Sequence, residues 1–279
     1  MKLIESSVQI IEEKDPYKMI ELAGRICYKS ENNITADSAK EFVDRMIKLG
    51  HGAMLEHGTV YLRIREEVNG NMPPAMLYWR HLANRTYSRI NYKIEADRPY
   101  KGNYGVLYIT TNMRVLVENE RLDDLQYQCE PTEYHDKRIT AKFICDRGVS
   151  HEFVRHRVFS FAQESTRYCN YSKDKFGNEL TFIKPAWFER EDLNDNINAD
   201  FEDQLIDTEE RYFSMMGLGL KPQEVRAILP NALKTELVMT GFESDWEHFF
   251  ELRCSKAAHP DAQKLANELK ELLTNVKNN

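Results

Sequence analysis

The sequence predicts an α/β fold, because strand-like and helix-like segments alternate along the chain. Apolar and polar residues alternate as they do in strands in three segments: 57–65, 139–145 and 233–241. Apolar residues recur at helical spacing most clearly in three others: 38–49, 200–216 and 260–275. The chain has 279 residues, of which 42% are hydrophobic, so it can bury a sizeable core, and its length fits one domain or two.

The first part of the chain reads as two helices followed by a strand. Residues 16–30 and 38–49 carry apolar residues at helical spacing. Ser38 and Glu41 form a capping-box pattern at the start of the second helix, and Gly50 marks its end. The alternation that follows Gly50 predicts the first strand.

The middle of the chain, residues 66–135, gives weaker signals. A strand is predicted at Tyr104–Thr110 and a helix at 111–119. The acidic and polar residues from 120 to 136 predict a surface connection.

The rest of the chain alternates again between strands and helices. The strand at 139–145 leads through a turn at Gly148 to a helix predicted at Val149–Arg157. The remaining predicted elements are a short strand at 179–183, a helix at 200–216, a strand at 233–241, and helices at 243–254 and 260–275. The apolar stripe of the last helix is typical of a core or a subunit interface and not of a ligand site.

The composition argues against several classes of protein. The formal net charge of −7 disfavours general nucleic-acid binding, which needs a basic surface. Five cysteines without a C-x-x-C pair indicate reduced thiols, so a cytoplasmic protein is expected. Charged residues follow Met1 almost at once, so no signal peptide is expected, and no apolar run is long enough for a membrane span.

The run from Arg155 to Tyr168 holds the strongest functional signal in the chain. It contains Arg155, Arg157 and Arg167, with Glu164 as the only acidic residue. Arginine offers five donors and a permanent charge, which suits phosphates and carboxylates. An acidic protein that binds an anion must concentrate its positive charge locally, and this run does so. Composition alone does not separate a ligand site from a surface group of arginines.

The spacing within this run adds a geometric expectation. If a helix continues through Arg157, Arg155 and Arg157 leave on opposite faces, because residues two apart differ by roughly 200°. They would then serve two ligands, or one ligand and a neighbouring subunit. Gln163, Ser165 and Arg167 would share one face of an extended backbone and form a cradle for a phosphate and a sugar.

A zinc motif is an apparent alternative that the spacing excludes. His151-Glu152 followed by His156 looks like H-E-x-x-H, but the two histidines are five residues apart instead of four. On a regular helix they would point roughly 140° apart, where the zinc motif requires roughly 40°. No metal site is therefore expected.

The order R-H-R, seven residues and then Ser165 resembles the signature of the flavin-dependent thymidylate synthases. Further segments, spread over nearly the whole chain, resemble other blocks of that family: Arg25–Tyr28, Leu55–His57, Val149–Val154, Arg226–Pro230, Thr240-Gly241, Trp246, His248-Phe249, Leu252-Arg253 and Ala262-Gln263. The span between His57 and Arg155 looks longer than in compact members, so residues 66–135 are interpreted as containing an elaboration within a single domain, 1–279.

The resemblance implies an α/β fold with an antiparallel or mixed sheet flanked by helices. It also implies a homotetramer in which subunits share each active site. The family methylates dUMP to dTMP: methylenetetrahydrofolate supplies the carbon, reduced FAD supplies the hydride, and NADPH reduces the flavin.

The resemblance also implies roles for individual residues. Six are expected to contact FAD: Thr59, Arg155, His156, Arg157, Gln163 and His248. Eleven are expected to hold dUMP: Glu152, Phe153, Val154, Arg155, Gln163, Glu164, Ser165, Thr166, Arg167, Arg226 and Arg253. Arg253 is the catalytic candidate, because a preorganised guanidinium favours the negative charge that builds on the pyrimidine. The hydride chemistry belongs to the flavin. No protein nucleophile is needed: Cys254 reads as a thiol on a helix and Ser165 as a hydrogen-bond partner of the substrate.

Two departures from the family pattern leave alternatives open. Ala162-Gln163 stands where members often carry Asn-Glu, and Phe242 and Ser244 stand where asparagine and arginine are common. Phe242 and Ser244 are the motive for one alternative, a related flavoenzyme that acts on another pyrimidine nucleotide. A non-catalytic nucleotide-binding protein that has lost its flavin is the other.

Overall fold

The computed structural model describes residues 1–67, 74–82, 87–97, 102–173, 176–188 and 190–278. The strands are β1 (Lys2–Ile4), β2 (Ser7–Ile11), β3 (Thr59–Glu67), β4 (Arg89–Asp97), β5 (Gly102–Asn112), β6 (Arg138–Asp146), β7 (Ser160–Gln163), β8 (Thr181–Ile183) and β9 (Lys234–Phe242). The α-helices are α1 (Pro16–Tyr28), α2 (Ser38–Lys48), α3 (Gly52–Leu55), α4 (Pro74–Leu82), α5 (Met113–Glu118), α6 (Arg147–Phe153), α7 (Asp195–Gly217), α8 (Pro222–Val225), α9 (Glu243–Arg253) and α10 (Pro260–Asn278). The 3-10 turns are η1 (Glu31–Asn33), η2 (Leu122–Tyr127) and η4 (Arg226–Ile228).

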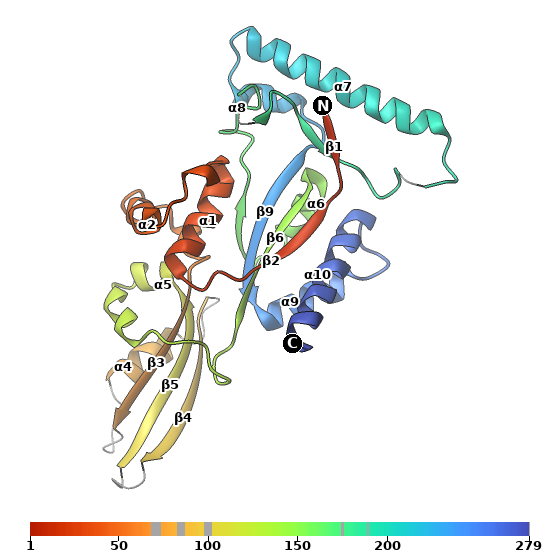
Figure 1. Ribbon diagram of the computed structural model, residues 1–279. Helices are drawn as coiled ribbons and strands as arrows, with labels where there is room; N and C mark the ends of the chain where they lie inside the picture. Colours follow the sequence, from red (N-terminus) through yellow and green to blue (C-terminus); the bar gives the residue numbers. More distant parts are fainter. Residues whose placement is uncertain (68–73, 83–86, 98–101, 174–175, 189, 279) are drawn as a thin grey trace.

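The central sheet has four strands in the order β2-β6-β9-β7, and every neighbouring pair is antiparallel. A second antiparallel sheet has the order β3-β5-β4, and β1 pairs with β8 in parallel. Figure 1 shows α1 and α2 on one side of the central sheet and α9 and α10 on the other. The predicted α/β fold with an antiparallel sheet flanked by helices is confirmed.

Helices on both sides explain the burial of the central strand β9. Its residues from Thr235 to Phe242 are all buried. Leu237 and Met239 face the cluster built by α6, α9 and α10, whereas Val238 faces Met19 on α1. The stripe of α10, with Ala262, Leu265, Ala266, Leu269 and Leu273, lies in the first of these clusters, as the sequence predicted for a core helix.

The three-stranded sheet extends away from the central sheet at the lower left of Figure 1. Its buried face, with Leu62 and Ile109, packs with Phe42 and Val43 of α2 and Ile20 of α1 in one hydrophobic cluster. The sheet therefore shares a core with the N-terminal helices. A third cluster, around Leu205 and Tyr212 of α7, lies at the opposite end of the molecule.

Most predicted elements are present, with three corrections. The capping box is wrong, because Asp37 precedes the helix and the Ser38 hydroxyl donates to Glu21 Oε2 at 2.8 Å. The helix predicted through Arg157 ends at Phe153. The surface connection at 120–136 contains a 3-10 turn and the buried His135. Parts of the 66–135 interpretation lie outside the described residues.

The sequence missed β1, β2, α3, α4, β4, β7 and α8. Most of these are short, and β2 and β7 pair with strands far away in the chain. β4 is longer and pairs with the next strand, β5, but its pattern is weak. None of the described helices has the length and apolar composition that a membrane span requires.

Candidate active site

The segment after α6 is held by three buried side chains spaced three residues apart. Phe153, His156 and Phe159 are 0%, 8% and 3% exposed. The amide of His156 donates to the Phe153 carbonyl and the amide of Phe159 to the His156 carbonyl, each at 3.1 Å, so the segment continues as turns. Arg155 and Arg157 between these anchors are exposed. Their separation therefore comes from turns between buried anchors, and the opposite-face argument from a continuous helix is wrong.

Aromatic packing places α9 beside this segment. The ring of Phe249 lies 5.1 Å from Phe153 and 5.0 Å from His156, centroid to centroid. Phe159 packs at 4.5 Å on Trp246. Such contacts add to the burial of apolar area. They fix the end of α9, where Arg253 lies, over the end of α6.

Arg253 uses three of its five donors on two side chains and a carbonyl. Its Nε donates to His156 Nε2 at 2.9 Å, its Nη1 to Glu152 Oε2 at 2.5 Å, and its Nη2 to the Glu152 carbonyl at 2.6 Å. Two N–H groups remain for a ligand. Arg155 approaches the same carboxylate, with Nη1 3.9 Å from Glu152 Oε1. Four predicted site residues therefore meet here.

The electrostatics keep this group in one protonation state at neutral pH. Burial, reinforced by the charge of Arg253, lowers the pKa of His156 to about 4, so the ring is neutral. Because Nε2 accepts from Arg253, the ring proton is on Nδ1. The hydrogen bond from Arg253 lowers the pKa of Glu152, which stays ionised. The result is a fixed guanidinium between an anionic and a neutral acceptor.

A cavity of about 440 Å³ opens beside Glu152 and Arg155. His151, Trp187 and His259 also line it. Small-molecule sites commonly have volumes of about 300–1,000 Å³, so a nucleotide-sized ligand fits the space.

Two predicted flavin residues lie near this group and one lies apart. Gln163 Nε2 donates to Ser150 Oγ on α6 at 2.8 Å. His248 is exposed on α9 and close enough to His156 to lower its pKa. Thr59 instead begins β3 and accepts from Arg138 Nη1 at 3.2 Å. It lines a different cavity, which also contacts the first residue of α9.

The predicted phosphate cradle is only partly extended. β7 ends at Gln163, and a turn begins at Ser165, whose carbonyl accepts from the amides of Tyr168 at 3.1 Å and Cys169 at 2.9 Å. Arg167 therefore does not continue an extended face with Gln163, and that prediction is wrong. Arg167 is exposed, with its guanidinium 5.1 Å from the Tyr168 ring.

The two other substrate candidates of this turn point inward. Glu164 is 3% exposed and is bound by Lys234 Nζ at 2.8 Å and the Tyr171 hydroxyl at 3.1 Å. Thr166 is 8% exposed.

Arg226, the remaining substrate candidate, is exposed in η4, beside the cluster of α7 and α8. One chain therefore gathers Glu152, Arg155, His156 and Arg253 but holds Arg167 and Arg226 elsewhere.

Phe242 and Ser244, which depart from the family pattern, have different structural surroundings. Phe242 is 2% exposed and lies under the guanidinium of Arg89, 4.0 Å from its ring. It is a packing residue between the two sheets. Ser244 is exposed on the first turn of α9.

Cys254 follows Arg253, and burial raises the pKa of its thiol. A raised pKa disfavours the reactive thiolate, in agreement with the prediction that Cys254 is not a nucleophile. His151 is exposed whereas His156 is buried against Arg253. Across the described ranges, no three His, Cys, Asp or Glu side chains are grouped as metal ligands.

Sequence reasoning missed two contributors, Ser150 and Arg138. Ser150 positions Gln163, but a lone serine on a helix carries no signal. Arg138 begins a strand, where an arginine ordinarily reads as a surface residue.

Fold and site together define an α/β protein with a partly buried group of charged and polar side chains centred on Arg253. The family described as thymidylate synthase complementing protein matches residues 134–277, just over half of the chain, and the chain belongs to this family. The matched part includes the whole group around Arg253, and the three-stranded sheet lies before it.

Curated relatives are named flavin-dependent thymidylate synthase. The protein of Geobacter sulfurreducens is 30% identical over 130 residues, which cover 47% of this chain and 53% of the relative. That of Pyrococcus furiosus is 28% identical over 122 residues, 44% of this chain and 48% of the relative. That of Mycobacterium tuberculosis is 32% identical over 133 residues, 44% of this chain and 51% of the relative. The chain thus spans about half the length of the curated relatives it matches.

Proposed function

We propose that this protein is a flavin-dependent thymidylate synthase that converts dUMP to dTMP in the cytoplasm, with methylenetetrahydrofolate as carbon donor and NADPH as reductant. One observation carries the proposal: Arg253 meets His156 and Glu152 of the signature region, 97 and 101 residues away in the chain. Membership in the family supports it.

Arg253 is the residue assigned to the pyrimidine. Its two uncommitted N–H groups can donate to a carbonyl oxygen and N3, where negative charge builds when C5 is activated. Glu152 and the neutral His156 hold the guanidinium in place, so little reorganisation is needed during the reaction.

The exposed arginines of the signature fit a flavin dinucleotide. Arg155 is 71% exposed, and Arg157 has no ion-pair partner in the part of the chain that the structure describes. Such guanidinium groups suit a diphosphate. His156, Gln163, His248 and Thr59 complete the proposed flavin set. When bound, FAD would supply the hydride.

We propose that two subunits complete each site within a homotetramer. The cradle residues Ser165 and Arg167, and Arg226 on η4, are separate from the Arg253 group within one chain. Their surroundings are exposed, so a second copy can bring them to a dUMP bound near Arg253. We further propose that the whole chain is one domain, because the three-stranded sheet shares its core with α1 and α2.

Release of tritium from C5-labelled dUMP, with FAD, NADPH and methylenetetrahydrofolate present, tests the activity. A yellow protein that releases tritium only with the folate supports the proposal. Turnover of dCMP alone would favour the second flavoenzyme candidate, for which Phe242 and Ser244 are the motive. A colourless protein that FAD cannot reconstitute would favour a non-catalytic nucleotide-binding protein.

A further inference from the structure

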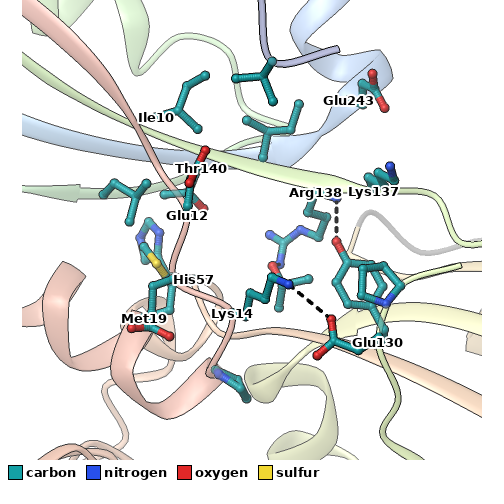
Figure 2. A pocket seen from close by; sticks show the side chains of 18 of the residues that line it. Ile10, Glu12, Lys14, Met19, His57, Glu130, Lys137, Arg138, Thr140 and Glu243 are labelled. Atoms are coloured by element: carbon teal, nitrogen blue, oxygen red, sulfur yellow. Dashed lines mark hydrogen bonds and ion pairs between the residues drawn. The ribbon is translucent and has the colours of Figure 1, made fainter. Parts of the chain in front are cut away.

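A second cavity, of about 720 Å³, lies where the three-stranded sheet meets the central sheet. Ile10 of β2, Thr140 of β6 and Leu273 of α10 line it from the central sheet and its helices, and Thr59 and Tyr61 of β3 from the other side. Figure 2 shows the side chains of Lys14, His57 and Arg138 around this space. Thr59 belongs to the proposed flavin set, but the proposed reaction gives no role to the other residues named here.

Arg138 has one guanidinium nitrogen, Nη2, that makes no hydrogen bond to the described residues and is not fully enclosed. Among the described residues, its side-chain hydrogen bonds come from Nη1, to the Glu56 carbonyl at 2.9 Å and to Thr59 Oγ1 at 3.2 Å. Nε is buried and has no hydrogen-bond partner among the described residues. Nη2 is not enclosed in this way, so it is the guanidinium nitrogen that can donate to an anion in the cavity.

No carboxylate neutralises Arg138. Within the described ranges no acidic group forms an ion pair with it, and the two that act on it from farther away are already engaged. Glu56 binds Arg114 at 2.5 Å, and Asp245 binds Arg89 at 3.3 Å. Burial lowers the pKa of Arg138 to about 10, so it still carries its charge at neutral pH. A half-buried charge without a carboxylate partner costs free energy, which an anionic ligand would offset.

The rest of the lining restricts the kind of anion. Apolar side chains, including Ile10, Met19 and Leu273, form much of the wall, so the ligand needs an apolar body. The neighbouring His57 is neutral, because burial and the charge of Arg138 lower its pKa to about 3.

Two lysines, Lys14 and Lys137, also line the cavity, and Lys14 pairs with Glu130 at 3.5 Å. The acidic residues of the lining outnumber the basic ones and disfavour a polyanion; they are Glu12, Glu13, Glu130 and Glu243. A lining with this balance of charge suits a ligand with a single negative charge.

We propose that this cavity binds an organic monoanion with an apolar body, whose carboxylate or equivalent group pairs with Nη2 of Arg138. The site is built jointly by the family-matched segment and the three-stranded sheet that precedes it. The proposal does not depend on the reaction proposed above.

Two fluorescent probes with the same body separate charge from hydrophobicity. The first is 8-anilino-1-naphthalenesulfonate, a monoanion, and the second is the uncharged N-phenyl-1-naphthylamine. Each is titrated into the full-length protein. Arg138→Met should weaken the anionic probe about tenfold or more, as expected for one charge-assisted pair, and leave the neutral probe within about twofold.

Arg63→Met is the matched control, because Arg63 is an exposed arginine on β3 that pairs with Glu95 outside the cavity. It should change neither affinity. Val276→Trp tests the location independently, since Val276 lines the cavity yet is 53% exposed and tolerates a larger residue. It should weaken both probes.

Three results would overturn the proposal. Unchanged affinity for the anionic probe in Arg138→Met would show that the charge of Arg138 does not contribute to binding. Equal losses for both probes would show that the substitution disturbs the structure. Normal binding in Val276→Trp would place the probes elsewhere. Displacement of the anionic probe by tripolyphosphate would replace the monoanion by a polyanion as the ligand class; the proposal expects no displacement.

Discussion

Two arginines in this protein are positioned in contrasting ways. Arg253 has a counter-ion in the protein, Glu152 at 2.5 Å, and a neutral partner in His156. Arg138 has a buried Nε without a partner and no carboxylate in contact within the described ranges. The first is a guanidinium held in place, as the role proposed for it at the pyrimidine requires. The second lacks a permanent negative charge, and a ligand can supply one.

The largest effect is expected from substitution of Arg253, the arginine with a counter-ion in the protein. Arg253→Ala should lower kcat for tritium release by about 10²–10³ or more, because it removes a preorganised donor from the developing charge. Bound flavin should remain, as measured by its visible absorbance. Arg211→Ala, at an exposed arginine of α7 paired with Asp207, is the control and should retain full activity. Loss of flavin in Arg253→Ala would show that the arginine faces the cofactor and not the pyrimidine.

An exposed arginine should contribute less. Arg167→Ala is expected to weaken dUMP binding by about 1.5–3 kcal/mol, the range for one charge-assisted hydrogen bond, without loss of bound flavin. Isothermal titration with dUMP measures the change. Affinity equal to that of the unaltered protein would show that Arg167 does not bind dUMP.

Burial and the charge of Arg253 keep His156 neutral, which predicts a pH dependence of stability. The folded pKa of His156, about 4, lies below its unfolded value, so the unfolded state binds more protons between these values. This contribution to the free energy of unfolding is present above pH about 6.5 and is lost as pH falls toward 4, by about 2 kcal/mol at pH 5.

Urea unfolding of the unaltered protein and of His156→Asn at pH 7 and pH 5 measures this contribution. The variant should lose about 2 kcal/mol less than the unaltered protein on acidification. The buried His57, whose pKa is also lowered, is unchanged in both proteins and cancels in the difference. Equal losses in the two proteins would contradict the assigned state of His156.

The smallest effect is expected at the arginine without a counter-ion. Arg138→Met should change the free energy of unfolding by less than about 1 kcal/mol, because the desolvation cost of a buried charge disappears together with two hydrogen bonds. Glu152→Ala should destabilise by about 1–3 kcal/mol, because it leaves the guanidinium of Arg253 unpaired. Chemical denaturation compares the two. A larger loss in Arg138→Met would assign Arg138 a mainly structural role.

The sequence by itself determined the α/β class, most helices, the strands β3, β5, β6 and β9, and the identity of the arginine-rich segment, because these depend on local periodicity and residue chemistry. It could not place the end of α6, since Phe153, His156 and Phe159 are anchored by aromatic side chains of α9, far along the chain.

Only the tertiary structure decided which arginines have counter-ions. Arg253 and Arg138 look alike in the sequence, but Arg253 has Glu152 across the α6–α9 contact. Around Arg138, the carboxylates of Glu56 and Asp245 pair with Arg114 and Arg89. Charge pairing acts over a few ångströms in space, and neighbours at that distance come from segments that the chain order keeps apart.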